Sequence, residues 1–148
     1  MINSFDFKNS DISDRMIAEN EYAFGFLNKM PIVPVHILIC PKRPITFSHE
    51  LLSEELMDIF LLKTKVCKIL QAALNIEGFN FAWNEGIIAG QTIPHFHLHI
   101  VPRKKGDAGI TEYEPRVFLY RPGSRADSQH EELTSFAIEL RKFLDYNE

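Results

Sequence analysis

A short run in which histidines alternate with bulky apolar residues limits most strongly how this chain can fold: His95-Phe96-His97-Leu98-His99-Ile100-Val101. In a β-strand every second side chain points to the same face, so the alternation predicts a strand from about residue 95 to 101. The three histidines would share one face, and the apolar residues between them would pack into a core on the other. We therefore expect a sheet with one polar, chemically reactive face.

Three further segments predict strands that extend this sheet. Residues 22–28 are rich in aromatic side chains, and residues 35–40 form a second apolar run. Pro31 and Pro34 make the connection between these two segments short and rigid, so we expect an antiparallel pair. Residues 79–84 return to alternation, and the glycine-containing turn that follows them predicts a hairpin with the histidine strand.

Two segments with helical periodicity predict the layer that covers the sheet. Ser53 is expected to cap the first helix, whose buried stripe would be Leu56, Ile59, Phe60, Val66, Cys67, Leu70 and Leu74. A second helix is expected from about residue 128 to 144, with its inward residues being Leu133, Phe136, Ala137, Leu140 and Phe143. A chain of 148 residues has the size of a single domain with one core.

The overall charge and hydropathy argue against several classes of partner. The formal net charge of -4 does not favour general binding to nucleic acid, which depends on clustered Lys and Arg. No apolar stretch approaches the roughly 20 residues that span a bilayer, and residues 1–6 lack the basic start of a signal peptide. Cys40 and Cys67 fit inert core thiols. We therefore expect a cytoplasmic protein with a small-molecule ligand, and neither nucleic acid nor membrane as a partner.

The three histidines admit three interpretations. They could be polar residues on a solvated sheet face, although six histidines in 148 residues rarely place three in register by chance. They could bind zinc or another transition metal through neutral imidazoles at alternating strand positions. The third interpretation is nucleophilic catalysis on phosphorus, in which one imidazole attacks while its neighbours orient it or donate protons.

The segment just before the histidines favours phosphorus chemistry. Gly86 and Gly90 allow the backbone to approach a ligand closely, and Gln91 with Thr92 supplies an amide and a hydroxyl for a phosphate oxygen. A three-histidine metal site needs none of these groups. Imidazole, with an ordinary pKa of about 6.5, is largely unprotonated at neutral pH and can attack without a metal. We therefore expect catalysis without a bound metal.

Residues 89–103 resemble the signature of the histidine triad (HIT) superfamily: Ala89-Gly90-Gln91-Thr92-Ile93-Pro94-His95-Phe96-His97-Leu98-His99-Ile100-Val101-Pro102-Arg103. The resemblance extends from about Asp14 to Asp107. It includes residues 34–43, where family members often show Pro-Gly-His and this chain has Val35 in place of the glycine. It implies an α+β fold with an antiparallel sheet and a long packing helix, usually built as a homodimer, with a nucleotide bound against the sheet.

The same resemblance implies a role for each residue of the motif. His97 would attack the α-phosphorus and become transiently nucleotidylated. His95 would orient His97 and support its charge. The phosphate would be bound by His99, Gln91 and Thr92, beside the backbone of Gly90.

Other positions are similar to family residues that surround the nucleotide. Asn84 matches a polar residue that contacts the bound nucleotide. In the fragile-histidine-triad branch, His36 is similar to a further histidine near the site, and Asn28 to a ribose-binding asparagine. Phe26 and Leu38 would line the base pocket.

The resemblance leaves several activities open. Hexose-phosphate transferases of the superfamily carry glutamine where this chain has His99, and no Trp-Pro-Pro-Gly ending typical of the phosphoramidase branch occurs near residues 144–148. Asn28, His36 and Thr92 favour hydrolases of dinucleoside polyphosphates such as diadenosine tri- or tetraphosphate, which release AMP. A purine nucleoside phosphoramidase and a nucleotide sensor without turnover remain alternatives. No tightly bound cofactor is implied, and any magnesium would arrive with the substrate phosphates.

Overall fold

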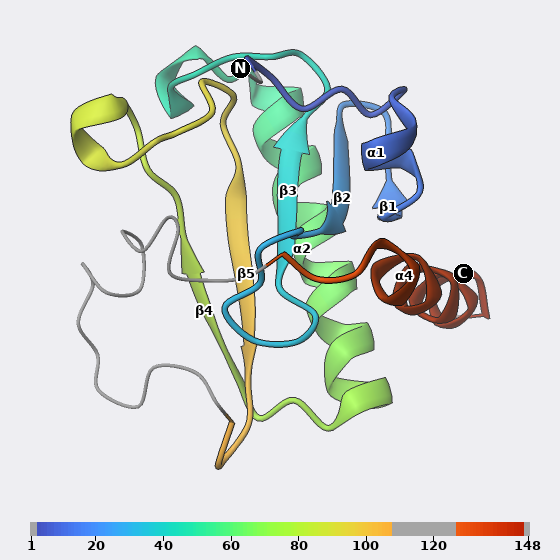
Figure 1. Ribbon diagram of the computed structural model, residues 1–148. Coiled ribbons are helices and arrows are strands. Elements are labelled where there is room, and N and C mark those ends of the chain that lie inside the picture. Colours follow the sequence, from blue (N-terminus) through green and yellow to red (C-terminus); the bar gives the residue numbers. More distant parts are fainter. Residues whose placement is uncertain (1–2, 108–126, 147–148) are drawn as a thin grey trace.

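The structure is a computed structural model that describes residues 3–107 and 127–146 (Figure 1). Its elements are, in order, α1 (Ser10–Ser13), β1 (Met16–Glu19), β2 (Ala23–Leu27), β3 (Ile37–Pro41), η1 (Ser48–Glu50), α2 (Ser53–Leu74), β4 (Gly78–Ala82), η2 (Ile87–Ala89), β5 (Leu98–Arg103) and α4 (His130–Tyr146). The strands form one antiparallel sheet in the order β1-β2-β3-β5-β4, and α2 packs along one face of it. The predicted α+β fold is confirmed.

Both predicted strand pairs are confirmed. Strands β2 and β3 pair in register from Ala23 opposite Pro41 to Leu27 opposite Ile37. Strands β4 and β5 pair from Gly78 opposite Arg103 to Ala82 opposite His99. Because β5 also pairs with β3, the histidine segment enters the middle of the sheet, where both neighbours hold it.

The predicted start of the histidine strand at residue 95 is wrong, because β5 begins at Leu98. Just before the strand, Phe96 N–H donates to the carbonyl of Ile45, which belongs to no strand, so these residues are extended but lie outside the sheet ladder. The alternation of faces persists even so. Phe96, Leu98 and Ile100 join the core cluster that α2 shares with the sheet, which leaves the histidines on the opposite face.

The start of α2 differs from the prediction that Ser53 caps it. Leu52 occupies the cap position, and Ser53 is the first helical residue. The orphan N–H of Leu52 donates instead to the Glu55 side chain at 3.1 Å, and the same carboxylate forms an ion pair with Arg43 at 2.7 Å. These two contacts draw the Glu55 side chain into the interior.

The buried stripe of α2 is rotated from the predicted one. Leu56 and Phe60 were expected to face inward, yet they are 48% and 46% exposed. The buried residues are Glu55, Ile59, Leu62, Val66, Ile69 and Leu70. Their spacing of three and four residues still forms one helical face, which packs against the apolar side of β2 and β3.

Helix α4 covers the outer edge of the sheet beside β1 (Figure 1). Its buried residues Leu133, Ala137, Leu140 and Leu144 join the same core cluster as α2 and the sheet. Phe143, which was predicted to face inward, is 46% exposed, because the stripe continues through Leu144 instead. Arg141 donates hydrogen bonds to the main-chain carbonyls of Met16 and Ser13 and so fastens α4 to the edge strand.

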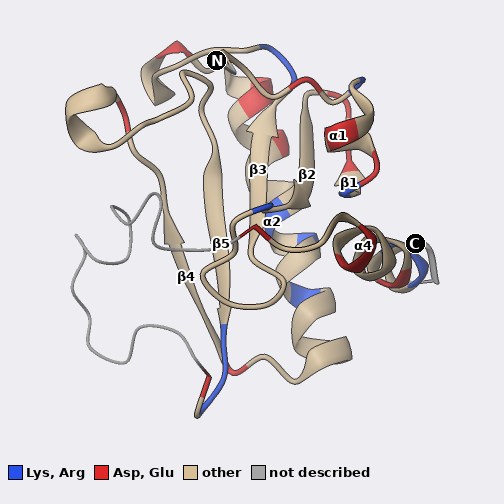
Figure 2. Cartoon of the chain, viewed as in Figure 1, with Lys and Arg blue, Asp and Glu red and all other residues tan. Residues whose placement is uncertain are grey.

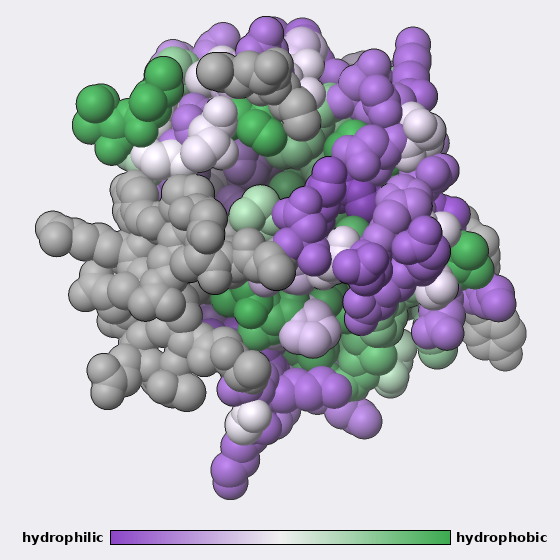
Figure 3. Space-filling view, in the orientation of Figure 1, coloured by the Kyte–Doolittle hydropathy of each residue, from purple (hydrophilic) through white to green (hydrophobic). Residues whose placement is uncertain are grey.

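Among the described residues, no helix is long and apolar enough to cross a bilayer. Apolar side chains are exposed at η2, at the upper left of Figure 3, where Ile87 and Ile88 are 88% and 100% exposed. Both cysteines are free thiols in or beside apolar clusters, as expected. Acidic side chains mark α1 and the beginnings of α2 and α4 (Figure 2).

Candidate active site

A pocket of about 450 Å³ lies between the histidine face of the sheet, the loop before β5 and the N-terminal segment. Most of the residues expected to bind a nucleotide line this pocket, namely Phe26, Asn28, Leu38, Asn84, Gly90, Thr92, His97 and His99. Three expected site residues, His36, His95 and Gln91, lie behind its wall and are buried. The sequence thus located the pocket, but it did not separate residues that line it from residues that support it.

His97 is oriented by a main-chain group. Its Nδ1 lies 2.7 Å from the carbonyl oxygen of His95, and because a carbonyl only accepts, Nδ1 carries the proton. The lone pair is therefore on Nε2, the nitrogen left for the pocket that His97 lines. Burial lowers the pKa of His97 below the ordinary 6.5, so the ring is neutral at neutral pH. A neutral imidazole with its lone pair on Nε2 has the protonation state that nucleophilic attack requires.

The ring of His95 is fully buried and holds two distant segments together. Its Nδ1 accepts the N–H of Phe5 at 3.0 Å, so Nε2 carries the proton and donates to the carbonyl of Pro41 at 2.7 Å. Burial lowers the pKa of His95 as well. His95 was expected to orient His97, and the group that contacts His97 Nδ1 is the His95 main-chain carbonyl. Its imidazole instead fixes β3 and the N-terminal segment against the site.

His36 and His99 form a hydrogen-bonded pair whose proton positions follow from one backbone group. The N–H of Ile32 donates to His36 Nδ1 at 3.0 Å, so the proton of His36 is on Nε2. That nitrogen lies 2.9 Å from His99 Nδ1 and donates to it. The proton of neutral His99 is consequently on Nε2. The two histidines that line the pocket thus differ in their proton positions, with Nε2 of His97 unprotonated and Nε2 of His99 protonated.

The loop before β5 is shaped by the buried side chain of Gln91. Its Oε1 accepts the N–H of Gly86 at 2.8 Å, and its Nε2 donates to the carbonyl of Thr46 at 3.1 Å. Gly86 and Gly90 have φ angles of 87° and 93°, which other residues adopt only with strain. Direct phosphate binding by Gln91 stays a prediction, and the geometry favours an indirect role in which Gln91 positions Gly90 and Thr92.

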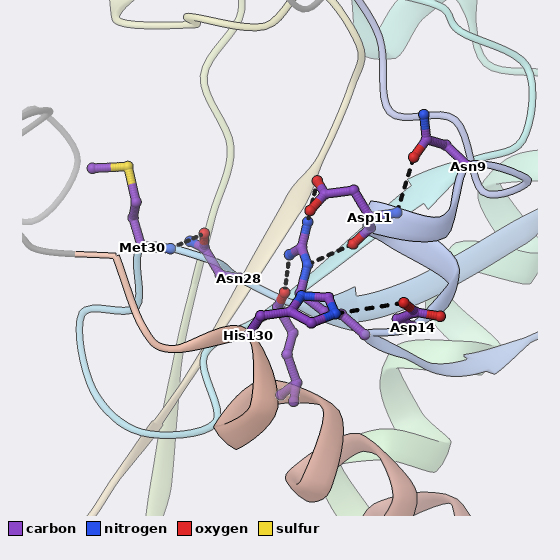
Figure 4. A network of polar contacts seen from close by, with 8 residues as sticks. Asn9, Asp11, Asp14, Asn28, Met30 and His130 are labelled. Carbon is purple, nitrogen blue, oxygen red and sulfur yellow. Dashed lines mark hydrogen bonds and ion pairs between the residues drawn. The ribbon is translucent and has the colours of Figure 1, made fainter.

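Asn28 stands where β2 ends at the pocket. Its Oδ1 accepts the N–H of Met30 at 3.0 Å (Figure 4), and its Nδ2 is 3.4 Å from both ring nitrogens of His36. The amide is therefore held between the loop and the histidine pair. Asn84 lies across the pocket on the segment after β4.

The N-terminal segment is the part of the site that the sequence did not reveal. Its contributions to the pocket are Ser4, Phe5, Asp6, Asn9, Asp11 and Ile12. The Phe5 ring centroid lies 5.4 Å from that of His97 and 5.2 Å from that of Phe26. Two aromatic residues near the start of a chain carry no motif, and the contact with His95 spans 90 positions of sequence. No local pattern predicts such a contact.

Val35 stands where family members often have glycine, and its backbone adopts the glycine conformation. Its φ angle is 66°, in the left-handed region that a β-branched residue rarely enters. The side chain packs against the main core cluster and lines a cavity of about 160 Å³ together with Leu133 and Phe136 of α4. The turn sets His36 where Ile32 N–H reaches its Nδ1.

No group of three or more His, Cys, Asp or Glu side chains in the described ranges is arranged to hold a metal ion. The histidines of the run illustrate the reason. Both nitrogens of His95, and one each of His97 and His99, are engaged by protein groups, so the three rings do not converge on one point.

The buried histidines predict how activity and stability depend on pH. Because burial holds the pKa of His97 below 6.5, kcat/KM should stay constant from pH 8 to 6.5 and decline only at lower pH. Histidines of the unfolded chain bind protons near pH 6.5, whereas His95 and His97 do not, so their contribution to stability is complete above that pH and is lost below it. A pH–rate profile and thermal melting check both expectations. An acidic limb centred above pH 6.5 would contradict them.

Comparison with known proteins places this site in a family. The model of the HIT domain matches residues 9–106. A bis(5'-adenosyl)-triphosphatase from Dictyostelium discoideum is 33% identical over 127 residues, which cover 86% of this chain and 83% of that protein. An asymmetrical bis(5'-nucleosyl)-tetraphosphatase from Schizosaccharomyces pombe is 33% identical over 101 residues, 68% of this chain but only 56% of the relative. A crystal structure of Plasmodium falciparum diadenosine triphosphate hydrolase superimposes with a TM-score of 0.74 at 27% identity, covering 90% and 78% of the two chains. This chain belongs to the HIT domain family.

Proposed function

We propose that the protein hydrolyses dinucleoside polyphosphates at the α-phosphorus through a nucleotidyl-histidine intermediate and releases AMP. The observation that carries this proposal is the orientation of His97, whose Nδ1 is bonded to the His95 carbonyl so that the Nε2 lone pair is left for the pocket. The names of the relatives, a diadenosine triphosphatase and a dinucleoside tetraphosphatase, support the choice of substrate class.

The reaction consists of two displacements at the same phosphorus. In the first, His97 Nε2 forms a P–N bond as the P–O bond to the rest of the substrate breaks, releasing ADP from a triphosphate or ATP from a tetraphosphate. In the second, water attacks the phosphorus and the P–N bond breaks, so that AMP leaves with the oxygen of the water, the protons of the water pass to solvent, and the neutral imidazole is restored. The lowered pKa of His97 keeps the ring unprotonated before the first step.

The surrounding residues take complementary roles in this scheme. His99 Nε2–H donates a hydrogen bond to a phosphate oxygen, with Thr92 and the Gly90 backbone beside it. His36 does not line the pocket and acts as a positioning residue that sets the proton of His99. The nucleoside occupies the slot lined by Phe26, Leu38, Asn28 and Asn84.

A substrate panel with matched chelation tests the proposal. Diadenosine tri- and tetraphosphate should be cleaved to AMP plus ADP or ATP, and prior removal of transition metals should leave the rate unchanged. Preferential cleavage of adenosine phosphoramidate would assign the phosphoramidase activity instead, and tight binding of AMP with negligible turnover would indicate a sensor. Stoichiometric zinc in the protein, together with complete loss of activity on its removal, would contradict the metal-free mechanism. A requirement for magnesium alone would not, because magnesium accompanies polyphosphates.

We also propose a homodimer that forms through the outer edge of β4, the last strand of the sheet. Phe81 and Trp83 near this edge are 42% and 44% exposed. Phe60 of α2 adds apolar surface next to them. The two parts are connected by Lys63, whose Nζ lies 4.8 Å from the ring centroid of Phe81 and 5.6 Å from that of Phe60. Light scattering should give about twice the chain mass of 17.1 kDa. Phe81→Glu should give monomers, whereas Ile138→Glu, a control at a comparably exposed site on α4, should not. A wild-type mass near that of one chain would contradict the proposal.

We propose the cytoplasm as the location of this activity. In support of this, Cys40 and Cys67 are free thiols, as a reducing compartment permits.

A further inference from the structure

The pocket has a second polar end, formed by Asp11 and Arg15, beyond its aromatic slot. The ring of Phe5 lies against His97 on one side and Phe26 on the other, at centroid distances of 5.4 and 5.2 Å. The guanidinium carbon of Arg15 lies 5.4 Å from the centroid of Phe26. Ring contacts thus connect His97 through Phe5 and Phe26 to Arg15. Both Arg15 and Asp11 line the pocket.

Arg15 is buried and fixed by three acceptors. Its Nε donates to the Asp11 carbonyl at 2.8 Å, its Nη2 donates to Asp11 Oδ2 at 3.2 Å, and its Nη1 donates to the Leu27 carbonyl. The N–H of Leu27 in turn donates to the carbonyl of Arg15 at 3.0 Å. Arg15 therefore fastens α1 to the end of β2, where Phe26 and Asn28 line the pocket. Asp11 is held rigidly with respect to the slot.

The carboxylate of Asp11 is only partly used by the protein. Figure 4 shows the Asp11 carboxylate turned toward a guanidinium, that of Arg15, which also donates to the carbonyl of Leu27. One oxygen, Oδ2, accepts from Arg15, while Oδ1 accepts no hydrogen bond from any residue in the ranges 3–107 and 127–146. The side chain is 47% exposed and belongs to the pocket wall. It has an acceptor position available for a ligand.

The charge at this end of the pocket indicates which part of a nucleotide it faces. Three carboxylates, of Asp6, Asp11 and Asp127, line the pocket against two cationic side chains, of Arg15 and Lys29. The guanidinium of Arg15 already donates to Asp11 and to the carbonyl of Leu27, and Asp127 also acts on it electrostatically. Negative charge therefore exceeds positive charge in the pocket wall. Carboxylates repel phosphate, so this end does not suit the polyphosphate. An ionised carboxylate only accepts hydrogen bonds, so its complement is an N–H or O–H donor. The O–H donors of a nucleotide are on the ribose, which the proposed function places beside Asn28. The group left for the Asp11 end of the slot is the N–H edge of the base.

We propose that Asp11 is a specificity-determining residue that accepts a hydrogen bond from an N–H group on the six-membered ring edge of a purine, with Arg15 holding its carboxylate in place. A 6-aminopurine offers its exocyclic amino group, and a 6-oxopurine offers its ring N–H. An unsubstituted purine offers neither. This inference rests on the proposed function only in taking the pocket as a nucleotide site.

Equilibrium binding of three nucleoside monophosphates to the full chain tests the inference. AMP, IMP and the monophosphate of unsubstituted purine riboside differ only at the edge in question. The wild-type protein should bind AMP, IMP or both about 10-fold more tightly than the unsubstituted analogue, the size expected of one charge-assisted hydrogen bond at a half-exposed site. Which of the two binds tightly identifies the donor as amino group or ring N–H.

The variant Asp11→Asn separates recognition from folding. The amide oxygen can replace Oδ2 as the acceptor for Arg15, which is a donor only, and this turns the amide nitrogen, itself a donor, toward the base. The 10-fold preference should therefore fall to about twofold or less. Asp14→Asn is the matched control, because Asp14 follows α1, is similarly exposed, pairs with His130 and does not line the pocket. It should keep the wild-type preference.

Equal binding of all three ligands by the wild type, or an unchanged preference in Asp11→Asn, would overturn the role of Asp11. Because binding of monophosphates needs no turnover, this result is independent of the hydrolysis assay. Base discrimination without hydrolysis would contradict the proposed activity alone, and hydrolysis without discrimination would contradict the present inference alone.

Discussion

Replacing His97 with alanine should lower turnover of diadenosine triphosphate by at least about 10⁴-fold, while AMP binding changes by no more than a few-fold. The effect is large because the P–N bond can form only at His97 Nε2. His99 carries its proton on the corresponding nitrogen, and both nitrogens of His95 are engaged by Phe5 and Pro41. No neighbouring imidazole has a lone pair to substitute.

Isotope labelling checks the attacked phosphorus in the same experiment. With wild-type protein in water enriched in oxygen-18, the label should enter AMP and not ADP, because water attacks the nucleotidyl group after ADP has left. His95→Ala and His99→Ala should retain a residual rate, since both leave the nucleophile in place. Label in ADP, or near-normal turnover by His97→Ala, would show that the nucleophile or the attacked phosphorus is assigned wrongly.

Replacing His36 with asparagine should reduce kcat by about 100-fold with little change in KM, although His36 does not line the pocket. Asparagine places a polar group near the position of Nδ1 and can accept the N–H of Ile32, but it is too short to donate to His99. His99 then loses the donor that keeps the proton on its Nε2, so the phosphate loses a hydrogen bond.

Glutamine at the same position provides the complementary control. Its amide nitrogen lies near the place of Nε2 and can donate to His99, so His36→Gln should retain more activity than His36→Asn. It should be the less stable variant, because the N–H of Ile32 loses its buried acceptor at a cost of about 1–3 kcal/mol. Initial rates and thermal melting of both variants measure the two effects separately. If the less stable variant, His36→Gln, is also the slower enzyme, the positioning role of His36 is ruled out.

Local patterns were sufficient for four strands of the sheet and for the centre of the site, whereas the edge strand β1 was not predicted. The alternation around His97 correctly separates a core face from a reactive face, even though the strand begins three residues later than predicted, at Leu98. Periodicity did not fix the rotation of α2, because apolar residues such as Leu56 and Phe60 also occur on its exposed face. The buried face includes the polar residue Glu55, which forms an ion pair with Arg43 there. Such a pair is visible only once the chain is folded.

The parts of the site that escaped prediction depend on contacts between remote segments. Gln91 has the chemistry of a phosphate ligand, and only its bonds to Gly86 and Thr46 reveal that its amide is already occupied. Phe5 closes the pocket from the other end of the sequence. The role of Arg15 similarly depends on the end of β2 being beside α1.

The left-handed backbone at Val35 has a consequence for the order of folding. A β-branched residue in this conformation costs on the order of 1–3 kcal/mol, so the unfolded chain rarely forms the turn by itself. The turn is held by packing of Val35 against the core cluster to which α4 contributes Leu133. We expect His36 to reach His99 only after α4 has docked, so that turnover during refolding reports completion of the whole domain and lags behind formation of the sheet.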